Sequence, residues 1–455
     1  MKRLQQLAFL FALTFAGFSC SDDDDAVETA TGEQFTMTEA SGVVTVEGSS
    51  EENVTFMANK KYLLKGFVYV KPGATLTIQP GTIIKGDKTS MATLVIERGA
   101  RIMAQGTAQA PIVFTSNQPK GSRNAGDWGG IIILGAAPTN LPSANAKIEG
   151  GVDRAYGGTT AADNSGVLSY VRIEFPGIAF QPDNEINGLT LGGVGSGTQI
   201  DHVQVSFCGD DSYEMFGGTV NAKYLIAYKT VDDMFDTDNG FSGNFQYLLG
   251  ISDPNVADAS GSNGFESDGD AQGSDNTPKT SAVFSNVSLF GPNATGNTTF
   301  NTNFKRAMHI RRNSNISIHN SLFAGWPVGL LLDGTKSQAN ATAGTLKIQN
   351  TYIAGTIAAN ALTKESGSTY DVATWFNAAG KNNMVVANNS DLGIAGSFTQ
   401  AGAPNFTVGA QLLTGASFTG LPAFFTSTGT NIGAFANGQD WTAGWANWDP
   451  KNTDY

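Results

Sequence analysis

The sequence predicts an all-β solenoid, a fold in which short strands from successive coils of the chain stack on one another. Charged residues make up only 15% of the 455 residues, and 55 glycines suit many tight corners, which argues against helical bundles and coiled coils. Short stretches with an apolar residue at every second position recur along the chain. Several return with related sequences after 22–32 residues and with no helical pattern between them, which is typical of a solenoid.

Residues 1–19 are expected to be the signal peptide of a lipoprotein. Lys2 and Arg3 precede an apolar run over residues 7–18, which is too short to span a bilayer as a helix. The small residues before Cys20 resemble a bacterial lipobox, in which the cysteine thiol is acylated. The acidic run over residues 22–25 resembles the surface-export signal of Bacteroidota lipoproteins. This resemblance implies a lipid-anchored protein of the outer membrane that faces the cell exterior.

The next two segments are expected to be a flexible acidic tether over residues 20–40 and the solenoid over residues 41–355. Three recurrences predict the register of the coils: 73–76 with 99–102, 171–175 with 203–207, and 315–325 with 345–355. Each coil would bury its apolar residues against the next, so no single repeat could fold alone. Asn320 and Asn350 fall at equivalent corners, where their amides could form a hydrogen-bonded ladder.

Residues 356–455 are expected to hold the C-terminal end of the solenoid and its cap. Trp441, Trp445 and Trp448 have the spacing i, i+4, i+7, which predicts one face of a short helix. A solenoid end exposes apolar core and needs a cap, so capping is the favoured role of these rings. An aromatic platform that stacks on sugars is the alternative.

The repeated phrases resemble the single-stranded right-handed parallel β-helix of the pectate-lyase-like superfamily. The stretch over residues 63–116 and the ending over residues 432–450 further resemble β-helical surface lipoproteins of Bacteroidota. The superfamily includes lyases, hydrolases, adhesins and non-catalytic binding proteins. The resemblance therefore implies a fold but does not by itself decide a function.

Acidic residues concentrate between residues 210 and 275 and repeat with the expected coil. Asp210-Asp211-x-x-Glu214 returns 22 residues later as Asp232-Asp233-x-x-Asp236. Residues one coil apart would be stacked about 5 Å apart, where two like charges repel by roughly 3 kcal/mol at an effective dielectric constant of about 20. The sequence of residues 239–241 recurs 24 residues later at residues 263–265. Further acidic residues directly follow this second copy.

Such a stack of carboxylates predicts a calcium site, because Ca²⁺ takes only oxygen ligands and accepts irregular geometry. The absence of neighbouring His or Cys in these motifs argues against zinc. The candidate ligands are Asp210, Asp211, Glu214, Asp232, Asp233, Asp236, Asp238, Glu266, Asp268 and Asp270. A solvated acidic ridge without a bound cation is the alternative.

A basic cluster follows the acidic region, and its candidate ligand-binding residues are His309, Arg311 and Arg312. His309 and Arg311 alternate with apolar residues, which predicts that both project from the outer face of one strand. The favoured interpretation is that these cations pair with nearby acids. The alternatives are contact with an anionic glycan and, in a lyase, removal of a sugar C5 proton by Arg311 while calcium neutralises the sugar carboxylate.

These features lead to one favoured function and two alternatives. We expect a non-catalytic surface lipoprotein whose calcium-stiffened side face binds an extracellular glycan or another nutrient destined for a TonB-dependent transporter. The alternatives are a calcium-dependent polysaccharide lyase that acts on uronic-acid glycans, and an adhesin or envelope-complex subunit. The 40 acidic and 27 basic residues give a net charge of −13, which argues against nucleic acid as a partner.

Overall fold

The structure is a computed structural model that describes residues 32–142, 146–148, 150–181, 184–294, 299–393, 404–406 and 408–455. The expected signal peptide, Cys20 and the first part of the tether lie outside the described residues. Residues 33–455 pack as one unit, to which the following description applies. None of the helices in the described ranges has the length and apolarity needed to cross a membrane.

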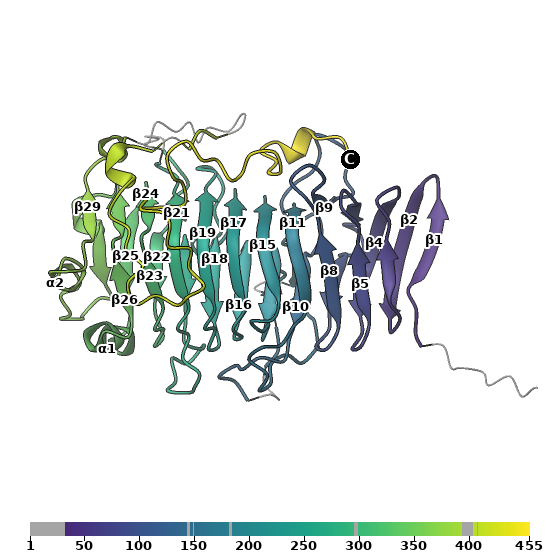
Figure 1. The fold of residues 1–455 in the computed structure, drawn as a ribbon, viewed down its shortest axis with the longest axis horizontal. Coiled ribbons are helices and arrows are strands. Elements are labelled where there is room, and N and C mark those ends of the chain that lie inside the picture. Colours follow the sequence, from purple (N-terminus) through teal and green to yellow (C-terminus); the bar gives the residue numbers. More distant parts are fainter. Residues whose placement is uncertain are drawn as a thin grey trace, which may run out of the picture. The chain divides into compact units, whose positions relative to one another are not determined.

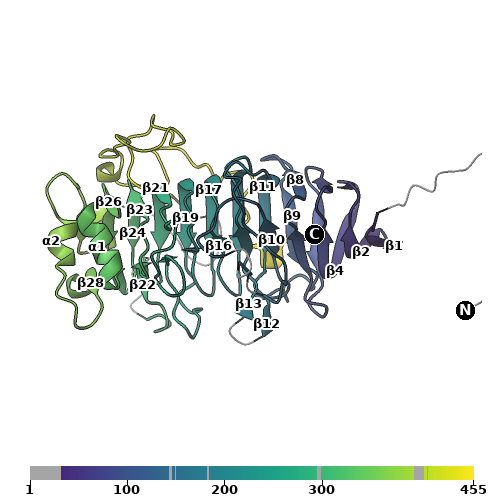
Figure 2. The same cartoon turned by 90° about the horizontal axis from the view of Figure 1, so that it is seen from below.

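This unit is a right-handed parallel β-helix whose strands form three stacks (Figures 1 and 2). The first stack holds β7 (Thr93–Ile96), β10 (Ile131–Leu134), β14 (Leu189–Gly192), β16 (Tyr213–Phe216), β18 (Phe235–Asp238), β20 (Phe265–Ser267), β22 (Arg306–Ile310), β25 (Val328–Leu332) and β28 (Leu362–Lys364). The second stack holds β3 (Val54–Phe56), β5 (Thr75–Ile78), β8 (Arg101–Gln105), β23 (Ser317–His319) and β26 (Lys347–Gln349). The third stack holds β6 (Ile83–Gly86), β9 (Ile112–Ser116), β24 (Leu322–Ala324), β27 (Tyr352–Ala354) and β29 (Met384–Val386).

Longer strands belong to two stacks because they continue around a corner of the coil. β2 (Val43–Ser50) and β4 (Lys61–Val70) join the third stack to the first. The strands that join the second stack to the third are β11 (Gly166–Glu174), β15 (Gln199–Ser206), β17 (Asn221–Tyr228), β19 (Asn244–Ile251) and β21 (Val283–Phe290).

The remaining elements lie at the ends or outside the stacks. The strands are β1 (Thr36–Ala40), antiparallel to β2, and the separate pair β12 (Ala179–Gln181) and β13 (Asn184–Glu185). The helices are α1 (Thr335–Ala343), α2 (Val372–Phe376), η1 (Ala358–Asn360), η2 (Asn389–Leu392), η3 (Ala410–Leu412) and η4 (Pro450–Asn452).

The predicted register of the coils is confirmed at all three recurrences. Leu76 pairs with Ile102, Val171 with Val203, and Ile318 with Ile348. These residues are fully or almost fully buried in one continuous apolar core. The inward position of each coil therefore stacks on the same position of the next, which is what stabilises a repeat that cannot fold alone.

The recurrence of residues 239–241 at 263–265 predicts the wrong register. Phe265 of β20 pairs with Phe235 of β18, 30 residues earlier, and not with Phe241. Asn263 consequently lies next to Asp233, whose carboxylate accepts its backbone N–H. The physical reason is that stacking follows the inward aromatic residue, and the loop over residues 252–264 lengthens this coil.

The β-structure begins five residues before the expected boundary at residue 41. Residues 36–40, assigned to the tether by the sequence, form β1, which pairs with β2. An antiparallel pairing occupies backbone groups at the open edge of the first strands, which a bare solenoid end would leave exposed.

The strands that pass from the second to the third stack bend at a residue with left-handed backbone. Tyr170, His202, Tyr224 and Tyr247 hold this position in four successive coils, with φ between 50° and 62°. Asn286, Asn320 and Asn350 hold it in the next three. The predicted equivalence of Asn320 and Asn350 is confirmed, but the amide of Asn320 donates to Ser285 Oγ and to the Ser417 carbonyl. The amide of Asn350 instead accepts from Asn382.

Residues 404–406 and 408–455, called the strap below, lie along the side of the β-helix and do not cover its end (Figure 1). Ser417 N donates to Asn320 at 2.8 Å, Thr426 N to Gln246 at 2.8 Å, and Tyr455 OH to Glu174 at 2.6 Å. The strap thus runs back from late coils toward earlier ones. At the C-terminal end itself, Val372 and Phe376 of α2 pack against the core.

The helix and cap predicted for the three tryptophans are therefore wrong. Residues 441–445 form consecutive turns. Trp445 is 1% exposed and packs edge-on against Tyr170 and His202, at ring distances of 5.9 and 5.6 Å. The rings of Trp441 and Trp445 contact the aromatic residues that stack at one corner of the coils. Consecutive turns can place side chains with the spacing i, i+4, i+7 on one side of the chain, as a helix does.

Candidate metal centre

The acidic side chains come from the strands of the first stack and from the loops just before them. Glu214 of β16 pairs in register with Asp236 of β18, Asp236 with Glu266 of β20, and Glu266 with His309 of β22. Parallel pairing without a register shift aligns the same position of each coil, so these side chains form a row. The first three are carboxylates and the fourth is an imidazole.

The loops before these strands add a second row. Asp211 accepts the backbone N–H of Asp233 at 2.8 Å, and Asp233 in turn accepts the backbone N–H of Asn263. The predicted stacking of Asp211 on Asp233 is therefore present. In the next coil an amide, Asn263, takes the place of the acid.

Two groups of carboxylates bring ligand atoms within 4.8 Å of one another. One group holds Asp210, Asp211 and Asp232, and the other holds Asp211, Glu214 and Asp236. Asp211 belongs to both and is 8% exposed. The sequence placed Asp210 near Asp232, and the structure brings them together.

Burial and the repulsion among these carboxylates raise the pKa values of the carboxyl groups. Burial, followed by the charge of neighbouring carboxylates, raises the pKa of Asp211, Asp233 and Asp236 well above the ordinary value. Burial and the charge of Asp258 raise the pKa of Asp232 to about 7. Within the described residues, no Lys, Arg or His forms an ion pair with Asp211, Asp233 or Asp236. A proton or a bound cation is needed to relieve the repulsion.

The other end of the row is neutralised by the predicted basic cluster. Arg311 forms an ion pair with Glu266 and a second one with Asp268, with Nε 2.8 Å from Oδ1. Arg312 Nη1 lies 2.8 Å from Asp268 Oδ2. His309 lies between Glu266 (Nδ1 to Oε2, 3.0 Å) and Asp333 (Nε2 to Oδ2, 3.2 Å). The expected pairing of these cations with acids is thus present.

Glu266 shows the effect of these partners on a carboxyl group. Although burial acts to raise its pKa, the hydrogen bond from His309 and the charge of Arg311 lower it below the ordinary value. Glu266 and Asp268 are therefore compensated by protein cations. Of the ten candidate ligands, these two fit a metal site least well.

Asp238 and Asp270 lie at the margin. Asp238 lies near Asp268, and burial together with the charge of Asp268 raises the pKa of Asp238 to about 7. Asp270 accepts hydrogen bonds from the backbone N–H groups of Gln272 and Ser274 at 3.0 and 2.9 Å. Its carboxylate thus closes a local turn, and it is absent from both carboxylate groups.

The donor set around Asp211 and Asp236 suits a hard divalent cation. All its donors are carboxylate oxygens, which Ca²⁺ prefers over nitrogen or sulfur. Asp236 Oδ1 is buried without a hydrogen-bond partner in the described part of the chain, a rare state for a carboxylate oxygen. The residues that would hold the cation are Asp210, Asp211, Glu214, Asp232 and Asp236; with Asp233, whose charge raises the pKa of Asp211, they are called the carboxylate cluster below.

A pocket of 410 Å³ lies beside the compensated end of the row. Its lining includes Arg311, Arg312 and Lys336, together with Asp333. Arg312 pairs with Asp268 and Lys336 with Asp275, but their side chains are 45% and 47% exposed, so a ligand can reach both. The carboxylate cluster lies on the coils of β16 and β18, and the cationic pocket lies on the coils of β20, β22 and β25 of the same stack.

Sequence reasoning missed Lys336, Asp333 and the pocket itself. Lys336 belongs to α1, which interrupts the coil after β25. The pairing of His309 with Glu266 follows from the strand register. The recurrence of residues 239–241 at 263–265 concealed it, because that recurrence predicts a different register for β20. Arg312 and Lys336 come from different coils, and no spacing rule links them.

Comparison with known proteins supports the fold. The family model described as a pectate-lyase like beta helix domain matches residues 48–446. No curated protein matches significantly. Among solved structures, the Dettilon tailspike protein aligns with 11% identity and a TM-score of 0.24, over 67% of this chain and 62% of the tailspike chain. The aligned part thus spans less than two thirds of the tailspike chain.

Proposed function

The chain belongs to the pectate-lyase-like beta-helix family, and from this premise we propose that it is a non-catalytic protein that binds an extracellular glycan at the cell surface. The observation that carries the proposal is that one stack of strands holds both the carboxylate cluster and, on later coils, the cationic pocket. Ca²⁺ held by the cluster would offer open coordination positions to sugar oxygens. Arg312 and Lys336 would bind the carboxylate of an acidic sugar.

Arg311 favours binding over elimination. A lyase base must lose its proton to accept the one from the sugar C5. Hydrogen bonding to Asp268 and the charges of Glu266 and Asp268 raise the pKa of Arg311 above its already high ordinary value. Arg311 therefore stays charged and holds two carboxylates in place, which is a positioning role.

Glycan binding is tested with the double variant Arg312→Ala/Lys336→Ala and with polygalacturonate and alginate as probes. Loss of two charged contacts is expected to weaken binding by about a hundredfold or more, since each is worth about 1.5–3 kcal/mol when well formed. Treatment with EDTA is expected to weaken binding to the unaltered protein. Isothermal titration calorimetry measures both effects.

Lys60→Ala is the matched control, because this lysine is 39% exposed and lies on an early coil away from the pocket. Equal binding by the double variant and this control would contradict the proposal. Release of unsaturated uronate, seen as new ultraviolet absorbance, would establish the lyase alternative instead. Capture of an envelope protein without affinity for either glycan would favour an adhesin.

Surface anchoring is proposed from Cys20 and the acidic run that follows it. The change Cys20→Ser removes the only thiol that a lipobox could acylate. The protein is then expected to leave the membrane fraction, and surface protease treatment of intact cells should no longer digest it. Membrane retention of the variant would contradict a lipid anchor, and co-purification with a TonB-dependent transporter would identify the expected partner.

A further inference from the structure

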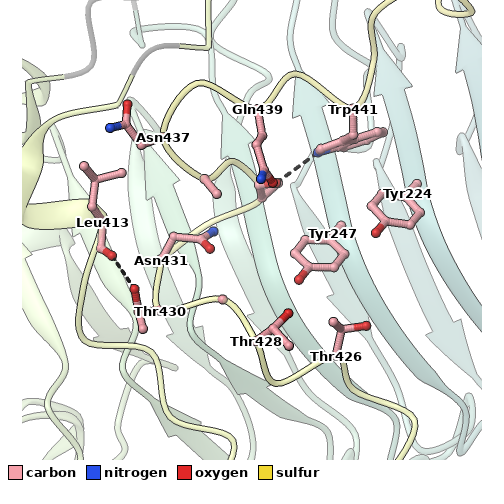
Figure 3. Close-up of a pocket in the computed structure, with 13 residues that line it drawn as sticks. Tyr224, Tyr247, Leu413, Thr426, Thr428, Thr430, Asn431, Asn437, Gln439 and Trp441 are labelled. Carbon is pink, nitrogen blue, oxygen red and sulfur yellow. Dashed lines mark hydrogen bonds between the residues drawn. The ribbon is translucent and has the colours of Figure 1, made fainter.

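A second pocket, of 480 Å³, lies between the strap and the corner of the second and third stacks (Figure 3). Its aromatic side chains are Tyr224, Tyr247 and Trp441. Side-chain hydroxyl and amide groups, including those of Thr428, Asn437 and Gln439, complete the lining. None of the described residues that line it is charged, although the protein carries a net charge of −13.

The aromatic wall is built by the repeat itself. The rings of Tyr170, His202, Tyr224 and Tyr247 stack along the corner at centroid distances of 4.2, 4.5 and 5.0 Å. Tyr247 is the last ring of this row, because the next coil has Asn286 at the same position. Trp441 lies on the strap, 5.4 Å from Tyr224 and stacked on Phe435 at 5.5 Å. Rigid rings from two distant segments thus meet at one pocket.

Two hydroxyl groups of the pocket, unlike the hydroxyls of Tyr213 and Tyr455, have no hydrogen-bond partner within the part of the chain that the structure describes. The hydroxyl of Tyr213 lies within hydrogen-bond distance of two backbone carbonyl oxygens, and the hydroxyl of Tyr455 donates to Glu174. Within the described chain, the hydroxyls of Tyr224 and Tyr247 have no such partner. Burial raises the pKa of Tyr247 to about 12, so this hydroxyl keeps its proton and can donate to a ligand.

We propose that this pocket binds a neutral saccharide. Aromatic rings pack against the apolar C–H faces of a pyranose, while hydroxyl and amide groups pair with its hydroxyls. A charged ligand would lack a counter-charge here, and the volume lies in the range of small-molecule sites. The site is separate from the carboxylate cluster, and it needs no cation.

The test measures binding of neutral cello-, malto-, xylo- and manno-oligosaccharides in the presence of EDTA. The unaltered protein is expected to bind at least one of them, with a change in tryptophan fluorescence. Trp441→Ala is expected to weaken binding by about tenfold or more, through loss of ring contact. Tyr247→Phe, which removes only the hydroxyl, is expected to weaken it by about three- to tenfold.

Tyr170→Phe is the matched control, since it removes a hydroxyl from the same row of rings but outside the pocket. Trp441→Phe covers the case in which Trp441→Ala does not fold. Neutral binding that is unchanged in Trp441→Phe, Trp441→Ala and Tyr247→Phe would overturn the proposal, as would failure of every neutral probe. Binding of polygalacturonate alone, lost with EDTA, would overturn this site while supporting the function proposed for the carboxylate cluster.

Discussion

In the presence of EDTA, the protein is expected to lose stability as the pH rises from about 5 to about 8, and saturating Ca²⁺ should offset part of this loss. The carboxyl groups of Asp232 and Asp238 have pKa values of about 7 in the folded protein, against 3.8 ordinarily. Between these values the folded state binds more protons than the unfolded state. A raised pKa therefore contributes stability at low pH that is lost as the pH passes the folded value.

The expected size of this effect is large. Each such group contributes about 1.4 kcal/mol per pH unit, so two groups give a loss on the order of 3–5 kcal/mol by about pH 7. The lowered pKa of Glu266 acts in the opposite direction, but only below its ordinary value of 4.5. Ca²⁺ at about 100 times its Kd would add about 2.7 kcal/mol. Thermal unfolding followed by circular dichroism measures both effects.

The variants Asp211→Asn and Asp233→Asn localise the effect. An asparagine keeps the oxygen that accepts the backbone N–H of Asp233 or Asn263 but removes the charge. We expect each variant to be more stable than the unaltered protein in EDTA at about pH 8, and to respond less to Ca²⁺. Glu47→Gln, at an exposed position of β2, is the matched control. A melting temperature that does not respond to Ca²⁺ would contradict a calcium site.

Arg311→Met is expected to destabilise the protein by about 3 kcal/mol or more in urea unfolding. The side chain of Arg311 is 25% exposed and lies between Glu266 and Asp268, which are 15% and 7% exposed. Removing one partner of a buried ion pair leaves the other charge without compensation, and this costs about 3–5 kcal/mol. The loss measures how strongly the basic cluster supports its acidic neighbours.

Two further variants give this prediction its control. Arg312→Met should cost about 1 kcal/mol or less, because that side chain is 45% exposed and water screens its pair with Asp268. The double variant Arg311→Met/Glu266→Gln should recover part of the lost stability, since it removes one of the charges left buried. Equal losses for the two arginine variants would show that Arg311 does not hold the row together.

The carboxylate cluster could be predicted in part, because strand register converts spacing into proximity. Asp210 and Asp232 are 22 residues apart and meet because one coil between β16 and β18 has that length. Asp270 has the same chemistry but turns its carboxylate to its own loop. Spacing identifies which residues share a coil position, but a loop can redirect a side chain that no strand holds.

The sequence alone was sufficient for the β-helix and the alignment of its coils, since apolar residues two apart in a strand must face the core and stack. It could not place the strap, whose Trp441 and Trp445 contact rings more than 190 residues earlier in the chain, such as Tyr224 and His202. It also could not pair Arg311 with Asp268 or form the pocket at Tyr247. These features depend on the path of loops and of the chain after the last coil, where no repeated pattern constrains which surfaces meet.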